Sequence, residues 1–278
     1  MSDITTTNLY SIDTFNTLII DPLFRQSVVL NSGMTRVNTA STQVHLPVIE
    51  DGQAHWTAEL APLVDSEITP SMLVVTPAKL VAYSVISSEA ANDQAAQQIV
   101  GQGLVSSLAK EVDQAFFIGD TNGIGPNGLA NASVTDLTGD ITELNPYMDA
   151  ISELETEGAS ANAIYMHPRT WSKFAQTRPQ TAPPAHMVGA SLGVGMQAVG
   201  TTTSPVRTIA GVQVFASAGC PENVAYVADA ARIAAVIRTD GVVETSRESE
   251  FGRDGVALRC ITRLDWGFPY GKSIVRIA

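Results

Sequence analysis

The sequence predicts a globular protein that combines strands with helices, and three observations support this prediction. Hydrophobic residues make up 45% of the 278 residues and charged residues 16%, enough apolar material for one large core or two modest ones. Runs rich in β-branched residues occupy 43–49, 72–86 and much of the last third. Between them, apolar residues of 91–117 recur about every four positions, which is the period of a helix.

The composition argues against several kinds of protein. The formal net charge is -12 and only four lysines occur, whereas nucleic-acid binding by affinity depends on clustered lysine and arginine. No stretch approaches eighteen apolar residues and the first residues lack a secretory signal, so we expect a protein that folds in the cytosol, outside any membrane. Cys220 and Cys260 cannot build a disulfide framework, and we expect them to be buried apolar residues.

The N-terminal quarter predicts an arm followed by a hairpin. Residues 1–30 are polar and then mixed, without a clear period, which is typical of an extended or partly helical arm. A strand over 43–49, a turn signal at 50–52 and a second strand over 55–59 together predict a long hairpin. The same pattern fits an ordinary antiparallel edge of the core, and the spacing leaves both interpretations open.

The next segment predicts two strands and a long amphipathic helix. The run 72–86 is rich in β-branched residues, and Pro77 marks an edge or a break between two strands. The apolar face of the helix is formed by Ala91, Ala95, Ile99, Leu104, Leu108, Val112 and Phe116. Gly101 and Gly103 interrupt this face, so we expect the helix to be weakened or bent there.

The rest of the chain alternates helices and strands. We expect helices over 145–157 and 168–174, with a buried strand over 163–166 between them. Residues 179–205 are rich in Gly, Thr, Ala and Pro, and this stretch is longer than a simple connection between two elements usually is. We therefore expect a mobile or interface-forming loop. Further strands are expected over 212–216, 224–227, 234–238, 256–263 and 273–277.

Three stretches imitate functional motifs, and each lacks the context that its chemistry requires. Gly189-Ala190-Ser191-Leu192-Gly193 fits the nucleophile elbow of serine hydrolases, but no histidine follows that could act as the base for Ser191. Residues 123–128 match G-x-G-x-x-G but follow a predicted helix and include Pro126 where backbone N–H groups would be needed. Gly271-Lys272-Ser273 resembles the end of a phosphate-binding loop, yet Trp266 stands where the first glycine belongs.

No metal site, cofactor or catalytic residue is predicted. The four histidines show neither an i, i+4 pair nor a carboxylate companion at ligand spacing. Carboxylate pairs that could act as general acid and base are no more frequent than in any acidic chain. We therefore predict that the protein is not an enzyme.

The order of the segments is more specific than any single motif. Ala54-His55-Trp56-Thr57-Ala58-Glu59 is followed by the run 76–83, by the helix over 93–117 and by the turn Gly119-Asp120-Thr121-Asn122-Gly123-Ile124-Gly125-Pro126-Asn127-Gly128. Segments 163–170, 211–214, 225–229 and 251–259 complete the order. Over about residues 35–270 this order resembles the major capsid proteins of tailed bacteriophages, the Hong Kong 97-like family. The strongest local signal is the turn, which is similar to the family's Gly-Asp-x-x-Gly-x-x-Pro-x-Gly.

The resemblance implies an α+β Hong Kong 97-like capsid fold. Its expected parts are an N-terminal arm (1–30), an extended β-hairpin loop (31–72), a peripheral domain with a long spine helix (73–128 and 236–278) and an inserted axial domain (129–235). It implies a structural subunit that self-assembles into pentamers and hexamers of an icosahedral virion capsid, made in the bacterial cytoplasm, around double-stranded phage DNA. A shell that a separate motor fills needs no affinity for DNA, so the acidic charge is compatible with this function.

The resemblance also implies contacts and partners. The expected inter-subunit contacts lie at the hairpin tip and in the loop 188–204, which would face a ring axis: Val48, Ile49, Glu50, Asp51, Gly52, Gln53, Trp56, Glu59, Gly193 and Gly195. The expected partners are further copies of the chain, a portal, and scaffolding and decoration proteins. With so short an N-terminal region, we expect the scaffold to be a separate protein or absent.

The chain departs from the family's founding member in one respect. That member joins its subunits by an isopeptide bond between an asparagine and a lysine of the extended loop, whereas this chain has no lysine before Lys79. We therefore expect non-covalent contacts. The alternatives are an encapsulin, which is a bacterial compartment shell with the same fold, a serine hydrolase using Ser191, and a monomeric binding module.

Overall fold

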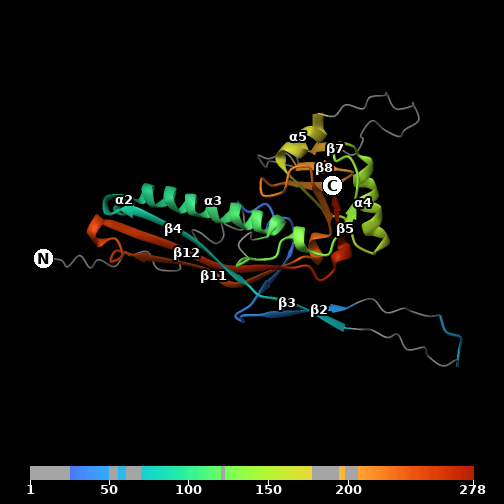
Figure 1. Cartoon of the computed structure of the whole chain (residues 1–278), viewed down its shortest axis with the longest axis horizontal. Coiled ribbons are helices and arrows are strands. Elements are labelled where there is room, and N and C mark those ends of the chain that lie inside the picture. Colours follow the sequence, from blue (N-terminus) through green and yellow to red (C-terminus); the bar gives the residue numbers. More distant parts are fainter. Residues whose placement is uncertain (1–25, 50–55, 61–69, 120–122, 177–193, 198–205) are drawn as a thin grey trace.

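Three parts make up the molecule in the computed structural model, which describes residues 26–49, 56–60, 70–119, 123–176, 194–197 and 206–278. The first part is a four-stranded sheet with a long helix lying along it (Figure 1). The second is a seven-stranded sheet with two shorter helices, and the third is a two-stranded ribbon that extends away from the four-stranded sheet.

The four-stranded sheet has one covered face and one open face. Its order is β1 (Thr35–Asn38), β11 (Ala234–Ser246), β12 (Gly255–Gly267) and β4 (Ala78–Ser87), with β1 parallel to β11 and the other neighbours antiparallel. After the short α2 (Ser88–Asn92), α3 (Gln94–Ile118) runs back along one face of the sheet (Figure 1). Along β4, half-buried and exposed side chains alternate strictly, as expected for a sheet covered on one side.

The long helix predicted over 93–117 is confirmed as α3. Its predicted apolar residues Leu104, Leu108, Val112 and Phe116 are buried, but Ile99 is 69% exposed. The helix continues through Gly101 and Gly103 without a break. Among the side chains of α3 that the structure describes, the first buried one is Leu104, just after the two glycines.

The strands of the seven-stranded sheet come from residues 135–277, and the order of the strands in the sheet differs from their order in the chain. Its order is β5 (Thr135–Leu137), β13 (Ile274–Ile277), β10 (Ala225–Ala228), β6 (Ala163–Met166), β9 (Val212–Ala216), β8 (Val206–Ile209) and β7 (Val194–Gln197). The predicted helices are confirmed as α4 (Asn145–Thr156) and α5 (Pro168–Gln176), which share one core cluster with this sheet. Short 3-10 helices occur at Leu129–Asn131 (η1), Ala230–Arg232 (η2), Phe251–Arg253 (η3) and Gly271–Ser273 (η4).

The predicted domain boundaries remain a prediction, but the pairing of β13 is relevant to the C-terminal one. Residues 274–277 were assigned to the peripheral domain, but β13 pairs with β5 and β10 in the seven-stranded sheet. We therefore place β13 with the axial part.

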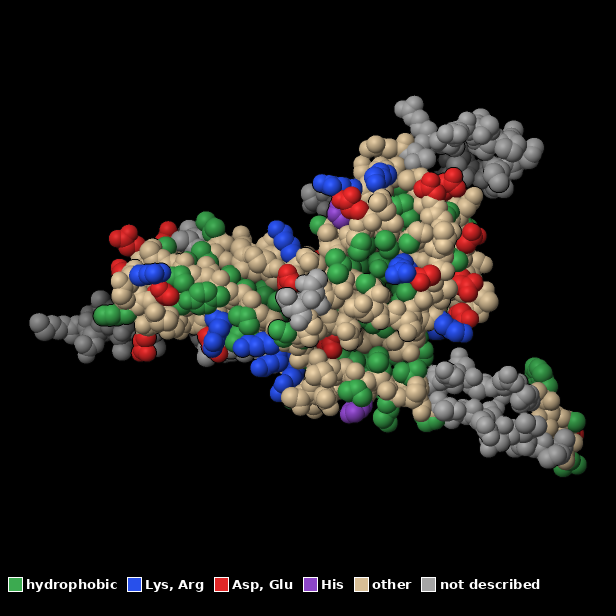
Figure 2. Space-filling model, in the orientation of Figure 1, with side chains coloured by type: hydrophobic (Ala, Val, Ile, Leu, Met, Phe, Trp, Pro, Cys, Tyr) green, Lys and Arg blue, Asp and Glu red, His purple; other side chains and the backbone are tan. Residues whose placement is uncertain are grey.

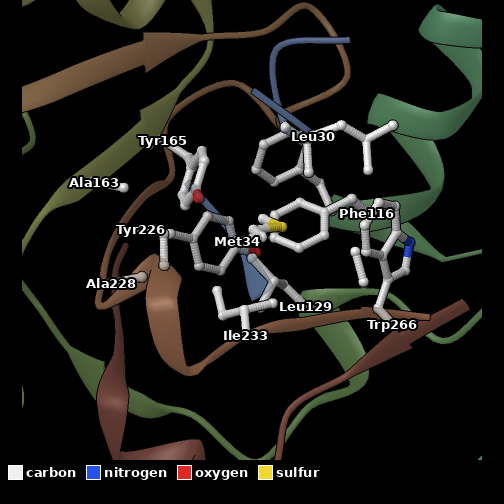
Figure 3. Close-up of a cluster of buried hydrophobic side chains, with 14 of the residues drawn as sticks. Leu30, Met34, Phe116, Leu129, Ala163, Tyr165, Tyr226, Ala228, Ile233 and Trp266 are labelled. Carbon is white, nitrogen blue, oxygen red and sulfur yellow. The ribbon is translucent and has the colours of Figure 1, made fainter. Parts of the chain in front are cut away.

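Aromatic side chains join the two sheets to α3 (Figure 3). The ring centroid of Phe116 lies 5.0 Å from those of Phe117 and Trp266 and 5.6 Å from that of Tyr165. Trp266 comes from β12 of the four-stranded sheet and Tyr165 from β6 of the seven-stranded sheet. The C-terminal half of α3 thus packs against both sheets in one core.

The extended hairpin exists, but its second strand was predicted wrongly. The ribbon pairs β2 (Val44–Ile49) with β3 (Pro70–Val75), whereas residues 56–60 are not a strand. The ribbon belongs to neither of the larger sheets, which excludes the alternative of an ordinary edge of the core. The turn signal at 50–52 favoured pairing of the first strand with the nearest strand-like residues, 55–59. In the structure the first strand, β2, instead pairs with the more apolar run that forms β3.

Candidate assembly surfaces

The ribbon is fixed to the body at its root. A Cβ added to Gly267 of β12 would lie 2.5 Å from Leu46 Cδ1 and 3.2 Å from Val75 Cγ2, so these side chains fill the space above the glycine. Beside them, the Asp265 carboxylate accepts a hydrogen bond from the backbone N–H of Thr76 at 3.2 Å. The root of the ribbon therefore has a defined position on β12.

Beyond its root, the ribbon carries uncovered apolar side chains. Met72 is 72% and Val74 is 49% exposed, and their partners on the same face are Pro47 and His45. A hairpin of two strands is only marginally stable by itself in water. Because contiguous exposed apolar surface marks interaction sites, this face of the ribbon is a candidate contact surface.

Four of the predicted contact residues lie on the ribbon or on its described connection. Val48 pairs with Ser71 and is half-buried, and Ile49 pairs with Pro70. Trp56 and Glu59 belong to the described segment 56–60, in which Trp56 and Leu60 are fully exposed. This segment lies at the far end of the connection between β2 and β3 (Figure 1). That these residues contact a neighbour remains a prediction.

The other predicted contact residues divide between the seven-stranded sheet and positions that are not described. Gly195 lies in β7, at the edge of the sheet, and pairs with Thr208. Gly193 and most of the loop 188–204 lie outside the described residues. The same holds for Glu50, Asp51, Gly52 and Gln53 at the predicted hairpin tip.

A buried carboxylate on α3 holds two other segments of the chain. Asp113 accepts hydrogen bonds from the Ser27 hydroxyl at 2.6 Å, from the N–H groups of Val28 and Val29 at 3.2 and 3.3 Å, and from the Ser217 hydroxyl at 3.2 Å. Burial raises the pKa of Asp113, and these hydrogen bonds oppose the rise. The segment that begins at Ser27 is thereby tied to the C-terminal part of α3.

The raised pKa of Asp113 gives a pH dependence of defined sign. Because the folded state binds the proton more tightly than the unfolded state, ionisation of Asp113 lowers stability as pH rises through its folded pKa. Asp113→Asn removes this titration. We therefore expect the melting temperature of the wild type to rise relative to that of Asp113→Asn between pH 7 and pH 4, measured on unassembled protein. A relative fall over this range would contradict the assignment.

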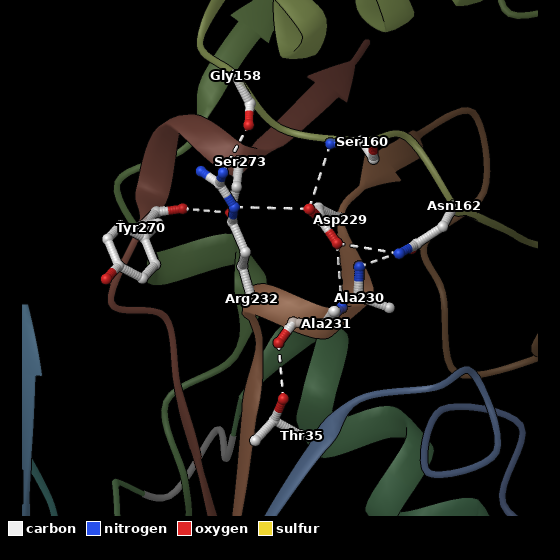
Figure 4. A network of polar contacts seen from close by, with 10 residues as sticks. All are labelled: Thr35, Gly158, Ser160, Asn162, Asp229, Ala230, Ala231, Arg232, Tyr270 and Ser273. Atoms are coloured by element: carbon white, nitrogen blue, oxygen red, sulfur yellow. Dashed lines mark hydrogen bonds and ion pairs between the residues drawn. The ribbon is translucent and has the colours of Figure 1, made fainter. Parts of the chain in front are cut away.

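The chain crosses from the seven-stranded to the four-stranded sheet through a polar network at η2 (Figure 4). Asp229 accepts hydrogen bonds from Ser160 N at 3.2 Å and from Asn162 Nδ2 at 2.9 Å, and Arg232 Nε lies 3.5 Å from its carboxylate. The Oδ1 atom of the same Asn162 side chain accepts a hydrogen bond from the backbone N–H of Ala230 at 2.7 Å. These contacts fix the chain where it leaves one sheet for the other.

The sequence interpretation did not identify the buried carboxylates Asp113, Asp229 and Asp265. The sequence does contain one signal for Asp113. It lies four positions after Ala109 and four before Phe117, so it shares a helix face with two apolar residues, both of which are buried. A carboxylate on the apolar face of a helix must find hydrogen-bond partners when it is buried. The segments that supply them here could not be identified from local spacing.

The described residues can be compared with the sites that the sequence analysis considered. Among them, no group of three His, Cys, Asp or Glu side chains is placed to hold a metal ion. In the same part of the chain no helix is long and apolar enough to cross a membrane. Ser191, the residue of the hydrolase alternative, lies outside the described residues.

Comparison with solved structures identifies the fold. The chain is similar to the capsid of the native GTA particle, with 14% identity over 90% of this chain and 89% of that chain and a TM-score of 0.66. It is similar to a chain of Mycobacterium phage Bobi (19% identity, 91% and 90% covered, TM-score 0.66). It is also similar to the virus-like particle from Pyrococcus furiosus (9% identity, 96% and 98% covered, TM-score 0.66). The fold is therefore the α+β Hong Kong 97-like fold of capsid shell subunits.

A family model then gives the family. The model of the phage capsid family matches residues 12–278, and the chain belongs to this family. A search of curated proteins finds no match. The chain is a major capsid protein, a structural subunit that associates with copies of itself in the icosahedral capsid of a virion.

Proposed function

We propose that copies of this chain form pentamers and hexamers that close into an icosahedral shell around a double-stranded phage DNA genome. The match of the capsid family across residues 12–278 carries this proposal. One kind of chain can build a shell of both pentamers and hexamers only if one set of surfaces makes slightly different contacts at five-fold and six-fold positions. A firmly packed body with a projecting ribbon is suited to this, because the ribbon can adapt while the body keeps its shape.

In this proposal the two ends of the molecule have different roles. The axial part, with Gly195 at its sheet edge and the loop 188–204, meets its copies around the ring axis. The ribbon, with Val48, Ile49, Trp56, Glu59 and the hairpin-tip residues 50–53, reaches across a neighbour and adds buried area. A portal, a scaffolding protein and a decoration protein are proposed partners, and assembly takes place in the cytoplasm of the bacterial host.

The test is to express the protein alone, and again with its scaffolding protein, and to examine both by size-exclusion chromatography and negative-stain electron microscopy. We expect closed shells or five- and six-membered rings. A protein that remains monomeric in both preparations would overturn the proposal.

A second candidate is a compartment shell that encloses protein cargo. It is favoured by the likeness to the virus-like particle, which covers 96% of this chain. The two candidates differ in what the particles contain. Particles from infected or induced cells should release double-stranded DNA after nuclease treatment of their exterior, whereas protein cargo without DNA would favour the compartment.

A further inference from the structure

Asp113 of α3 is buried, unlike most carboxylates that the structure describes. On the face shown in Figure 2, Asp and Glu side chains lie at the surface, over α4 and at the far end of the four-stranded sheet. Asp113, in contrast, is 7% exposed. A buried carboxylate costs free energy unless hydrogen bonds replace the water that it has lost. The segments that supply these hydrogen bonds therefore determine how stable this part of the core is.

The two oxygens of Asp113 are divided between two segments of the chain. We call residues 27–29 the arm root, and residues 217–219, which follow β9, the axial turn. Oδ1 accepts hydrogen bonds only from the arm root, from the Ser27 hydroxyl and the Val29 N–H. Oδ2 accepts one from each segment, from the Val28 N–H and the Ser217 hydroxyl, both at 3.2 Å. Oδ2 is therefore the atom at which the two segments meet.

The axial turn lies directly against the backbone of α3. A Cβ added to Gly219 would lie 2.7 Å from Gln114 N and 2.8 Å from Asp113 C. The Gly219 N–H donates to the Ser217 hydroxyl oxygen at 3.2 Å, while the hydroxyl itself donates to Asp113. The turn thus keeps water from one side of the carboxylate and presents a hydroxyl that is already oriented towards it.

The arm root covers the carboxylate in the same way. The Leu30 N–H donates to the Ser27 hydroxyl oxygen at 3.2 Å, and this hydroxyl donates to Asp113 at 2.6 Å. Val29 and Leu30 belong to the buried cluster that contains Phe116. If either segment moves away, the carboxylate loses a hydrogen bond from an oriented hydroxyl and becomes open to water on that side.

We propose that Asp113 couples the arm root to the axial turn, so that each segment is held more firmly on α3 when the other is in place. With both segments present, the buried carboxylate has four hydrogen-bond donors. When the axial turn withdraws, water enters beside Oδ2 and competes with the arm root for the carboxylate. A displacement of the axial part thereby loosens the arm root.

This coupling is a property of the single subunit, so it goes beyond the proposed function and does not depend on a shell. Coupling between two sites acts equally in both directions. Loosening the arm root must therefore also loosen the axial turn. Residues in one hydrogen-bond network are typically coupled strongly enough to change a local equilibrium by a factor of about three or more.

Hydrogen exchange of single amides in the unassembled protein tests the coupling, because local opening controls the exchange of protected N–H groups. We expect Ser217→Ala to accelerate exchange at Val28 and Val29 by at least about threefold, relative to the core amide of Val227 in β10. Ser27→Ala should accelerate exchange at Gly219 by a similar factor. The two variants test the coupling independently, and melting curves check that each one folds.

Two further variants separate coupling through the carboxylate from general loosening. In Asp113→Asn the side chain retains one acceptor oxygen and can no longer accept hydrogen bonds from both segments as the carboxylate does, so Ser217→Ala should have little additional effect on the arm root. The control Ser273→Ala removes a buried hydroxyl that donates to Tyr270 O at 2.6 Å, away from Asp113. It should leave the exchange ratios of the arm root and the axial turn unchanged.

Three results would overturn the inference. The first is unchanged exchange of the arm root in Ser217→Ala and of the axial turn in Ser27→Ala. The second is an equal acceleration at the Val227 reference amide, which would mean that the whole subunit is destabilised. The third is an effect of Ser217→Ala that persists in full in Asp113→Asn, because the two segments would then communicate through packing alone. None of these results depends on whether the protein forms shells, so the proposed function is tested separately.

Discussion

Replacement of Gly128 by alanine is expected to prevent the protein from folding into a soluble subunit. A Cβ at this position would lie 2.2 Å from Gly119 N, 2.6 Å from Ile118 C and 2.9 Å from Ala115 O. These are backbone atoms at the end of α3, and Gly119 has a φ of +79° that favours glycine. Because neither side can move without breaking the end of the helix, we expect a loss of more than about 3 kcal/mol.

The measurement is the soluble yield and melting temperature of Gly128→Ala beside those of Gly101→Ala. Gly101 lies within α3, and a Cβ there meets nothing within 4 Å. Alanine favours the helix by ~1 kcal/mol over glycine, so the control should be as stable as the wild type or more stable. A Gly128→Ala variant with the wild-type melting temperature would contradict the described packing of the turn.

Truncation of Phe116 to alanine is expected to destabilise the subunit by about 4 kcal/mol, in the range measured for buried aromatic residues. Its ring contacts aromatic rings from both sheets, with Trp266 on one side and Tyr165 on the other. The variant therefore loses packing between the two parts of the molecule as well as within one core. Urea unfolding of the unassembled protein measures the change, provided that the transition is reversible.

Phe251→Ala is the matched control for Phe116→Ala. Phe251 lies in η3 and is 87% exposed, so its removal should change stability by less than about 0.5 kcal/mol. Equal effects of the two substitutions would show that Phe116 is not at the centre of the core.

Periodicity predicted those elements whose packing follows from local sequence. The four-residue spacing of Leu104, Leu108, Val112 and Phe116 is the buried face of α3, and Pro77 separates β3 from β4 as predicted. The pattern gave β11 as only 234–238, whereas the strand continues to Ser246. Its register to β12 shifts between Ile237 and Thr239 and again before Val242, and such irregularities interrupt the alternation that identifies a strand.

The candidate surfaces were less accessible to sequence reasoning, because they depend on which distant segments meet. The hairpin tip was placed at 48–53, but the chain returns to the ribbon only at Pro70. The two serines that donate to Asp113, Ser27 and Ser217, are far apart in the sequence, and only the fold brings them together. The likeness in segment order identified the family because it reflects the whole fold and does not depend on any one local pattern.

A cryo-electron microscopy map of assembled particles, at a resolution that separates the strands, tests the central claim most directly. We expect copies of the chain at five-fold and six-fold positions, with the β2–β3 ribbon of each copy lying on an adjacent copy. Particles in which every ribbon folds back on its own subunit, or preparations without any closed particle, would contradict a shell built in this way.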